Sequence, residues 1–397
     1  MSPVRQARGA GPSAGAGRAL RVMLVAGEAS GDGYGARLVQ ALRDEQPDVR
    51  FFGMGAQAMR AQGVHLLFDV TGRGAIGFVE SLREYPLYRR VLARLAEGAR
   101  RLKPDVAVLI DFPGFNLRLG PLLARMGIPV VYYVAPAVWA WGAGRARAVA
   151  AFASRVICVF EFEVPLYRQA GAPAEWLGHP ILDDVPQRPP AAAALREVGL
   201  APGGPVVALL PGSRFQEIQT LYPVMVRAAQ AIHAARPDVR FVASVAPGID
   251  SGLLVAAGGV AHRELGIRLV GGGIWRSLAV AETAVVAAGT AALQAALWQV
   301  PMVVVYRVSE ATYWLAKRLV RVSHVSLPNI VAGRPVVEEL LQHDARPERV
   351  AQALLDRLER PDRLASERQE LSEVRRRLGE PGAARRAARV VLEVAGR

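Results

Sequence analysis

The stretch from Val206 to Glu217, VVALLPGSRFQE, most constrains how this chain can fold. Its leading apolar run, VVALL, is typical of a buried strand in a parallel sheet, and Pro-Gly ends such a strand sharply. Ser213 and Arg214 follow where a helix begins, and a helix N-terminus favours an anion through its N–H groups and its dipole. Because a guanidinium matches phosphate oxygens, we predict a diphosphate site here. An ordinary strand–helix turn with a solvent-facing arginine is the alternative.

The same alternation of strand, loop and helix runs through both halves of the chain. Apolar strand patterns that end in Gly or Asp recur at 21–27, 105–111 and 283–289, and each is followed by a loop or a helical pattern. A chain of 397 residues is too long for one compact core. We therefore predict an α/β protein with two Rossmann-like domains, whose parallel sheets face each other across a cleft.

Changes in composition predict the domain boundaries. Residues 1–19 read as a disordered Gly-, Ala- and Arg-rich tail without the apolar segment of a secretory signal, and 20–184 as the first domain. A Pro-rich linker follows at 185–204 and the second domain at 205–365. Helices over 366–397 are expected to pack back on the first domain. Pro223 predicts a break in the helix that follows Arg214.

A net charge of +14 and an isoelectric point near 10.8 favour a polyanionic partner. Nucleic acid is disfavoured, because the basic residues are scattered and no basic-aromatic binding motif is present. A phosphorylated ligand or an anionic membrane surface remains. The basic amphipathic segment 78–102 fits a membrane surface, although such a helix can equally pack on a sheet with its charges in water.

Several other classes of protein are not favoured by the sequence. Cys158 is the single cysteine, so no internal disulfide can form, and we expect a buried thiol in a reducing cytoplasm. The six histidines lack metal-binding spacing, and we predict neither a metal nor another cofactor. Gly53, Gly55 and Ala58 outline a dinucleotide fingerprint, but no acidic partner follows a next strand. The uncharged stretch 283–306 has transmembrane length, yet its Gly, Gln and Pro predict strand, loop, helix and strand.

Asp111 is the candidate for acid–base chemistry. It ends the strand pattern DVAVLID and precedes a Pro-Gly turn. A carboxylate at the carboxyl end of a parallel strand lies at the ligand-binding edge of an open α/β sheet. Capping of the following turn is the alternative role.

Nine segments in order resemble those of the lipid-A-disaccharide synthase family, from Leu20 to near the end of the chain. They are AGEASGDGYGARL, IGFVESL, IDFPGFNLRL, VAPAVWAWGAGR, LGHP, LPGSRFQEI, AAGTAALQAAL, WLAKRLV and SLPNIVAGRPVVEELLQ. The resemblance implies a GT-B type glycosyltransferase. Such an enzyme joins UDP-2,3-diacylglucosamine to 2,3-diacylglucosamine 1-phosphate with inversion, and it releases UDP. It also implies a peripheral protein of the inner membrane of a Gram-negative bacterium, with a homodimer left open.

The resemblance also implies roles for particular residues. Asp111 would take the proton of the acceptor 6-hydroxyl, and Arg214 would balance the charge that grows on the departing UDP. Other donor contacts would come from Gly212, Ser213, Gly271, Gly272, Gly273, Gly289, Thr290, Gln294 and Asn329. The acceptor side would be lined by Glu28, Ser30 and Asp32. Asn329 could instead form a turn, and His179 could be a satisfied hinge residue.

This chain departs from the family pattern at the nucleotide end. The family usually has glutamate where Gln294 stands and serine where Ala288 stands. A carboxylate accepts both ribose hydroxyls strongly, whereas the neutral amide oxygen of glutamine accepts more weakly. A UDP-sugar epimerase or a non-catalytic binder of nucleotide sugars or lipids on the same scaffold therefore stays open. A serine hydrolase is disfavoured, because neither Ser30 nor Ser213 lies in G-x-S-x-G.

Overall fold

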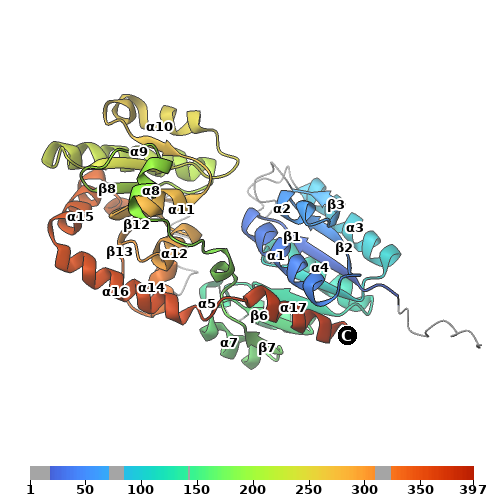
Figure 1. Ribbon diagram of the computed structural model, residues 1–397. Helices are drawn as coiled ribbons and strands as arrows, with labels where there is room; N and C mark the ends of the chain where they lie inside the picture. The colour runs from blue at the N-terminus through green and yellow to red at the C-terminus, as the bar shows by residue number, and fades with distance from the viewer. Residues whose placement is uncertain (1–17, 71–84, 142–143, 309–322) are drawn as a thin grey trace, which may run out of the picture.

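A computed structural model describes residues 18–70, 85–141, 144–308 and 323–397 (Figure 1). The expectations for the tail over 1–17, for the start of the basic segment at 78–84, and for the IGFVESL and WLAKRLV motifs lie outside these residues. The described part contains two sheets in which the paired strands are parallel, with helices around them. This confirms the predicted α/β class with two Rossmann-like domains.

The first domain is built on a seven-stranded sheet in the order β3-β2-β1-β4-β5-β6-β7. Its strands are β1 (Arg21–Ala26), β2 (Arg50–Gly55), β3 (His65–Asp69), β4 (Val106–Ile110), β5 (Val130–Tyr133), β6 (Arg155–Cys158) and β7 (Ala174–Trp176). Its α-helices are α1 (Ala29–Glu45), α2 (Gln57–Ala61), α3 (Tyr85–Leu102), α4 (Pro113–Arg125), α5 (Val138–Trp141), α6 (Gly144–Ala150) and α7 (Val164–Gln169), with short 3-10 helices η1 (Glu161–Glu163) and η2 (Pro180–Asp184). The central strand β4 is buried along its whole length, which explains its uninterrupted apolar sequence.

The second domain is built on a six-stranded sheet in the order β10-β9-β8-β11-β12-β13. Its strands are β8 (Val206–Leu210), β9 (Arg240–Ser244), β10 (Arg268–Val270), β11 (Thr283–Ala287), β12 (Met302–Tyr306) and β13 (Glu338–Leu341). Its helices are α8 (Ala191–Glu197), α9 (Phe215–Ala235), α10 (Ser251–Glu264), α11 (Ile274–Val280), α12 (Thr290–Leu297), α14 (Leu327–Ala332), η3 (Gln342–Asp344), α15 (Pro347–Glu359) and α16 (Pro361–Arg377). The uncharged stretch 283–306 is β11, α12 and β12. Among the described residues, none of the helices combines the length and apolar character that a membrane span requires.

Helix α9 runs without interruption through Pro223, so the predicted break is wrong. Proline inside a helix costs about 3 kcal/mol relative to alanine. The neighbouring side chains of Leu221, Tyr222, Val224 and Met225 are all buried in the core on this helix. Burial of several large side chains, at about 1.5–3 kcal/mol each, outweighs the cost of the proline.

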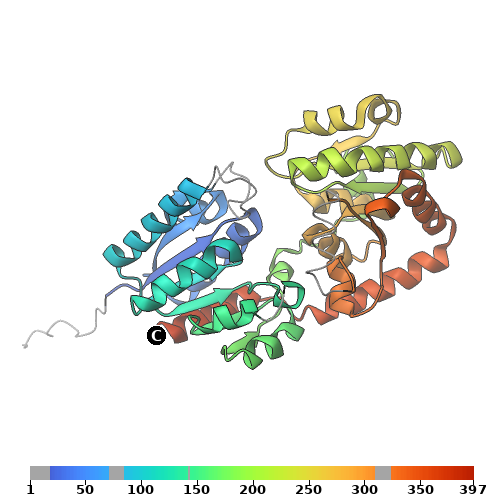
Figure 2. The same ribbon diagram turned by 180° about the vertical axis from the view of Figure 1, so that it is seen from behind.

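The chain crosses between the domains twice (Figure 2). The two crossings are hydrogen-bonded to each other. The backbone N–H of His179 donates to the carbonyl of Leu378 at 2.8 Å. The carboxylate of Asp183 accepts from the N–H groups of Gly382 and Ala384, at the start of α17 (Ala383–Val394). Of the helices expected to pack back on the first domain, α17 packs on α1, whereas α16 packs on α12 and α14 of the second.

The linker segment 185–204 contains α8, which packs on α11.

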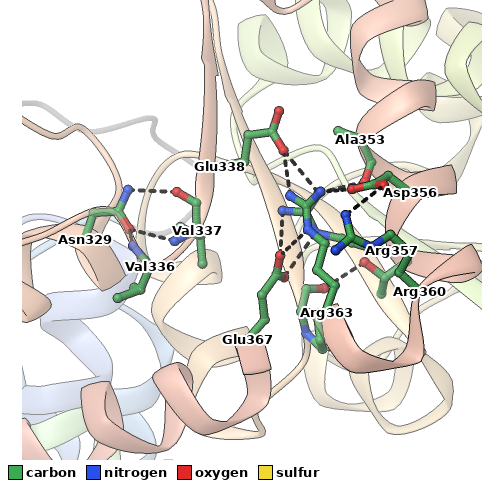
Figure 3. Close-up of polar contacts among 12 residues, drawn as sticks. Asn329, Val336, Val337, Glu338, Ala353, Asp356, Arg357, Arg360, Arg363 and Glu367 are labelled. Atoms are coloured by element: carbon green, nitrogen blue, oxygen red, sulfur yellow. Dashed lines mark hydrogen bonds and ion pairs between the residues drawn. The ribbon is translucent and has the colours of Figure 1, made fainter. Parts of the chain in front are cut away.

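Arg357 of α15 forms ion pairs with two other elements at the end of the second domain (Figure 3). Its side chain is 1% exposed and lies 3.2 Å from the carboxylate of Glu338 and 2.9 Å from that of Glu367. It also donates to the carbonyl of Ala353 at 2.7 Å. The three partners come from β13, α16 and α15, so this guanidinium joins three elements. A buried charge of this kind depends on its partners, because unpaired carboxylates or cations are costly away from water.

We predict that Arg357→Ala lowers the free energy of unfolding by about 3 kcal/mol, because it removes a fully buried side chain and one of the two cations that Glu338 and Glu367 share with Arg363. The matched control is Arg360→Ala, on the next turn, whose side chain is 57% exposed in its pairs with Asp356 and Asp362. That control should change stability by less than about 1 kcal/mol. Urea unfolding of the full chain measures both, and equal losses would contradict this account of the cluster.

Candidate active site

The predicted site residues gather at the switch point of each sheet. In the first domain β1 and β4 are neighbours, with Ala26 paired to Ile110, and the strand order runs outward in opposite directions from them. Ligands of open α/β sheets bind outside the carboxyl ends of the strands at such a point. Glu28 lies two residues beyond β1, and Asp111 directly follows β4. The two carboxylates therefore share one edge of the sheet.

The second domain repeats this arrangement with β8 and β11, in which Leu210 is paired to Val286. The loop after β8 carries Gly212, Ser213 and Arg214, and the loop after β11 carries Gly289 and leads into Thr290. The predicted diphosphate residues, on the first loop, and two of the residues predicted for the uridine end, on the second, thus lie at the second switch point.

The two switch points approach each other across the domains. Nη2 of Arg214 lies 3.9 Å from Oε2 of Glu28, although the two residues belong to different sheets. The Arg214 side chain is 68% exposed and the Glu28 side chain 32% exposed. The predicted phosphate-binding cation therefore faces the loop that neighbours Asp111.

Asp111 sits in a strained turn. Its φ is +46° and that of Phe112 is +52°, a conformation that non-glycine residues seldom adopt and that is most often found at functional sites. The Asn116 side-chain amide and the Tyr132 hydroxyl both donate to the carbonyl of Asp111, at 2.7 and 2.8 Å. A Cβ at Gly27 would fall on the ring of Phe112, so only glycine fits beside this turn. The surroundings thus hold the strained turn in place.

The environment of Asp111 makes it a stronger base than an ordinary aspartate. Burial, helped by the charge of Glu28, raises the pKa of Asp111 to about 6, and the N–H of Phe112 opposes the shift. A carboxylate with a pKa near 6 is ionised at neutral pH and still holds a proton well enough to act as a general base.

Glu217 caps the N-terminus of α9. Its Oε2 accepts from the N–H groups of Ser213 and Arg214 at 3.2 and 3.3 Å, and its Oε1 lies 3.4 Å from Nη1 of Arg214. Gly212 has a φ of +101°, and a Cβ there would fall on the Glu217 carboxylate. Two of the N–H groups that we assigned to a diphosphate are therefore bound to Glu217 in this structure. Glu217 is not among the predicted site residues, although its place three residues after Arg214 is the spacing of a capping box.

The residues predicted for the nucleotide lie at the carboxyl ends of β10 and β11. Gly271, Gly272 and Gly273 join β10 to α11, and the last two have φ values of +81° and +104°. Gly289 has a φ of +148° and precedes α12, on which Thr290 is exposed and Gln294 half-buried. The edge is the one that carries Arg214, and the roles of these residues remain predictions.

Two predicted ligand contacts are corrected by the structure. Asp32 is buried, and its carboxylate accepts from the N–H groups of Ala56, Ala58 and Met59 at the start of α2, so it does not line the acceptor side. This carboxylate also occupies the helix N-terminus that the dinucleotide fingerprint would offer to a phosphate.

Asn329 is the second correction (Figure 3). Its side chain is buried, its amide oxygen accepts from the N–H groups of Val336 and Val337, and its amide nitrogen donates to the carbonyl of Val337 and to Glu339. With both ends of the amide bound inside the protein, Asn329 holds the turn before β13 and is not available to a sugar or a diphosphate.

Three further residues have clear positions. His179 is buried at the crossing, its Nδ1 accepts from the N–H of Ile181 at 3.0 Å, and burial lowers its pKa to about 3, so it is a neutral hinge residue. Ser30 is exposed in the first turn of α1. Cys158 is buried at the end of β6, and burial raises the pKa of its thiol. Within the described ranges, no group of three or more His, Cys, Asp or Glu side chains is arranged to hold a metal ion.

Comparison with known sequences identifies the family. A family model described as lipid-A-disaccharide synthetase matches residues 22–394. A lipid-A-disaccharide synthase of Myxococcus xanthus is 46% identical over 385 residues, which cover 94% of this chain and 97% of that protein. Another, of Syntrophus aciditrophicus, is 41% identical with coverage of 94% and 97%.

Comparison with solved structures agrees at the level of the fold. A UDP-GlcNAc 2-epimerase of Neisseria meningitidis bound to UDP-GlcNAc superposes with a TM-score of 0.63 at 10% identity, over 94% of this chain and 99% of that chain. The calicheamicin glycosyltransferase CalG4 gives a TM-score of 0.59 at 15% identity, over 96% and 99%. Taken with the family model and the sequence relatives, these findings show that the chain belongs to the lipid-A-disaccharide synthase family of glycosyltransferases.

Proposed function

We propose that this chain transfers 2,3-diacylglucosamine from its UDP derivative to the 6-hydroxyl of 2,3-diacylglucosamine 1-phosphate. The products are the β-1,6-linked lipid A disaccharide 1-phosphate and UDP. The names of the relatives support the reaction. The observation that carries the proposal is the 3.9 Å approach of Arg214 to Glu28, because it brings a phosphate-binding cation to the sheet edge that holds Asp111.

The chemistry is a single displacement with inversion. The acceptor 6-oxygen attacks the anomeric carbon, its proton passes to the Asp111 carboxylate, and the bond from that carbon to the UDP oxygen breaks. Negative charge grows on the diphosphate as the bond breaks. In this proposal the guanidinium of Arg214 turns from its carboxylate partners to the diphosphate and balances that charge together with N–H groups of the first turn of α9.

The nucleotide end of the donor binds to the glycine loops of the second domain. In this proposal Gly271, Gly272 and Gly273 let the backbone approach the uridine closely, and Gly289 and Thr290 contact the same end of the donor. Gln294, half-buried on α12, accepts a ribose hydroxyl with its neutral amide oxygen.

Attachment to the anionic cytoplasmic face of the inner membrane is part of the same proposal. Helix α3 buries Tyr88 and Leu95 in the core, so its apolar face is not free to enter a bilayer, while Arg89, Arg90 and Arg94 are exposed. Attraction of such arginines to anionic headgroups is electrostatic and screened by salt. We predict cosedimentation with phosphatidylglycerol vesicles at low salt that is lost at high salt, and no binding at low salt would contradict the attachment.

Mass spectrometry of the products tests the reaction directly. The purified chain with both lipid substrates should form the disaccharide 1-phosphate and UDP. Omission of the acceptor separates an epimerase, which would still convert the donor. A protein that binds both substrates and forms no disaccharide would contradict the proposed activity.

We predict that Asp111→Asn lowers kcat by about 10²–10⁴-fold, because it removes the base and keeps its shape. In the wild type, kcat/KM should fall as the pH drops through about 6, because protonation of Asp111 removes the base. Burial raises this pKa above its unfolded value, so the ionised carboxylate opposes folding at neutral pH. Asp111→Asn should therefore keep or raise the melting temperature, and near-normal turnover in this variant would rule out the assignment.

Donor binding is tested by titration with UDP. Arg214→Ala should weaken UDP binding and lower kcat by about 10²–10³-fold, because the guanidinium contacts the diphosphate in both states. Arg236→Ala, at the far end of α9 in a surface pair with Asp238, is the control and should bind UDP normally. Gln294→Glu should bind UDP as well or better, because a carboxylate accepts ribose hydroxyls more strongly. Unchanged UDP affinity in Arg214→Ala would place the diphosphate elsewhere.

A further inference from the structure

Arg214 lies between two carboxylates that come from different domains. Its Nη2 is 3.9 Å from Glu28 of the first domain, and its Nη1 is 3.4 Å from Glu217 on its own helix. A bound diphosphate competes with both carboxylates for this guanidinium, because all three are anions that seek the same donors.

The two carboxylates, Glu28 and Glu217, keep different partners when the guanidinium of Arg214 turns to a diphosphate. Glu217 keeps the backbone N–H groups of Ser213 and Arg214, which continue to stabilise its charge. Among the described residues, Arg214 is the cation in contact with Glu28. Loss of that contact leaves the charge of Glu28 without its cation.

Glu28 also acts on Asp111. The two residues follow the neighbouring strands β1 and β4, and the charge of Glu28 raises the pKa of the Asp111 carboxylate. Two other titratable groups interact with Asp111, Tyr34 on α1 and Tyr132 on β5. Neither tyrosine is charged near neutral pH, because burial raises the pKa of both hydroxyls.

We propose that Glu28 is a positioning residue that couples the two substrate sites: a diphosphate takes Arg214 from Glu28, and the unbalanced charge of Glu28 then makes Asp111 a stronger base. This inference rests on the proposed function, since it requires a diphosphate donor. Its consequence is that acceptor deprotonation is strengthened only when the donor is in place. The basicity of Asp111 is thereby linked to donor binding, because the diphosphate replaces Glu28 as the ionic partner of Arg214.

Proton uptake on UDP binding tests the coupling without any turnover. Isothermal titration calorimetry with UDP at about pH 6.5, in buffers of different ionisation enthalpy, gives the protons taken up per UDP bound. The wild type minus Asp111→Asn isolates the protons that Asp111 takes up and cancels the titration of UDP itself. The same difference is then measured in the Glu28→Gln background, as a double-mutant cycle.

With Glu28 present, Asp111 should take up protons when UDP binds, so the difference in proton uptake between the wild type and Asp111→Asn should be positive. In the Glu28→Gln background this difference in proton uptake should fall by about half or more, because the charge of Glu28 no longer acts on Asp111. The matched control is Glu45→Gln, at the other end of α1, whose carboxylate is also 32% exposed and paired with an arginine, Arg389. That control should keep the full difference. An equal difference in the Glu28→Gln background would overturn the coupling, whereas failure of UDP to bind the wild type would overturn the proposed function itself.

The pH dependence of kcat gives a second readout that a structural role would not move. Because kcat reports the substrate-bound enzyme, Glu28→Gln should shift its acidic limb to lower pH, since loss of the neighbouring negative charge lowers the pKa of Asp111. Glu45→Gln should leave the limb in place. An acidic limb that stays at the wild-type pH in Glu28→Gln would contradict the proposal.

Discussion

The pair of chain crossings between the domains is the constraint on which the site depends. Asp183 binds the first N–H groups of α17, and His179 is bonded to Leu378, so the outgoing and returning segments are joined. Helix α17 then buries Ala387 and Val391 on the first domain beside α1. Each hydrogen bond contributes about 1 kcal/mol, and the buried apolar side chains add more. The exposed contact of Arg214 with Glu28 is worth about 0–1 kcal/mol, so it follows from the crossings and does not hold the domains together.

In the proposed mechanism the two domains contribute different halves of the chemistry. The first supplies a carboxylate at the end of β4, in a strained turn that Asn116 and Tyr132 secure through the Asp111 carbonyl. The second supplies a cation at the end of β8, where a glycine with positive φ ends the strand and a helix begins. Because each group lies at the switch point of its own sheet, joining the sheets edge to edge brings the proposed phosphate-binding cation to the sheet edge that carries the proposed base. The topology of the two sheets, with few side chains, therefore determines where we propose that the reaction takes place.

Local patterns predicted the fold well and assigned the candidate site to the carboxyl edges of the sheets, because both inferences depend on short segments. Buried strands that end in Gly or Asp identified the carboxyl edges, and these edges carry Asp111, Arg214 and the glycine loops. The hydrogen-bond partners of buried polar side chains could not be predicted from such short segments. The partners of Asp32 lie 24 to 27 residues along the chain, so its role as a cap for α2 depends on how two loops pack. The packing around Pro223 likewise depends on a core assembled from distant segments.

The most direct measurement of the central claim is a crystal structure of the protein with UDP and an acceptor analogue bound. The account predicts the diphosphate on the guanidinium of Arg214 and the acceptor 6-hydroxyl within hydrogen-bond distance of the Asp111 carboxylate, both between the two sheets. A diphosphate bound away from the start of α9, or an acceptor hydroxyl that contacts another base, would contradict it.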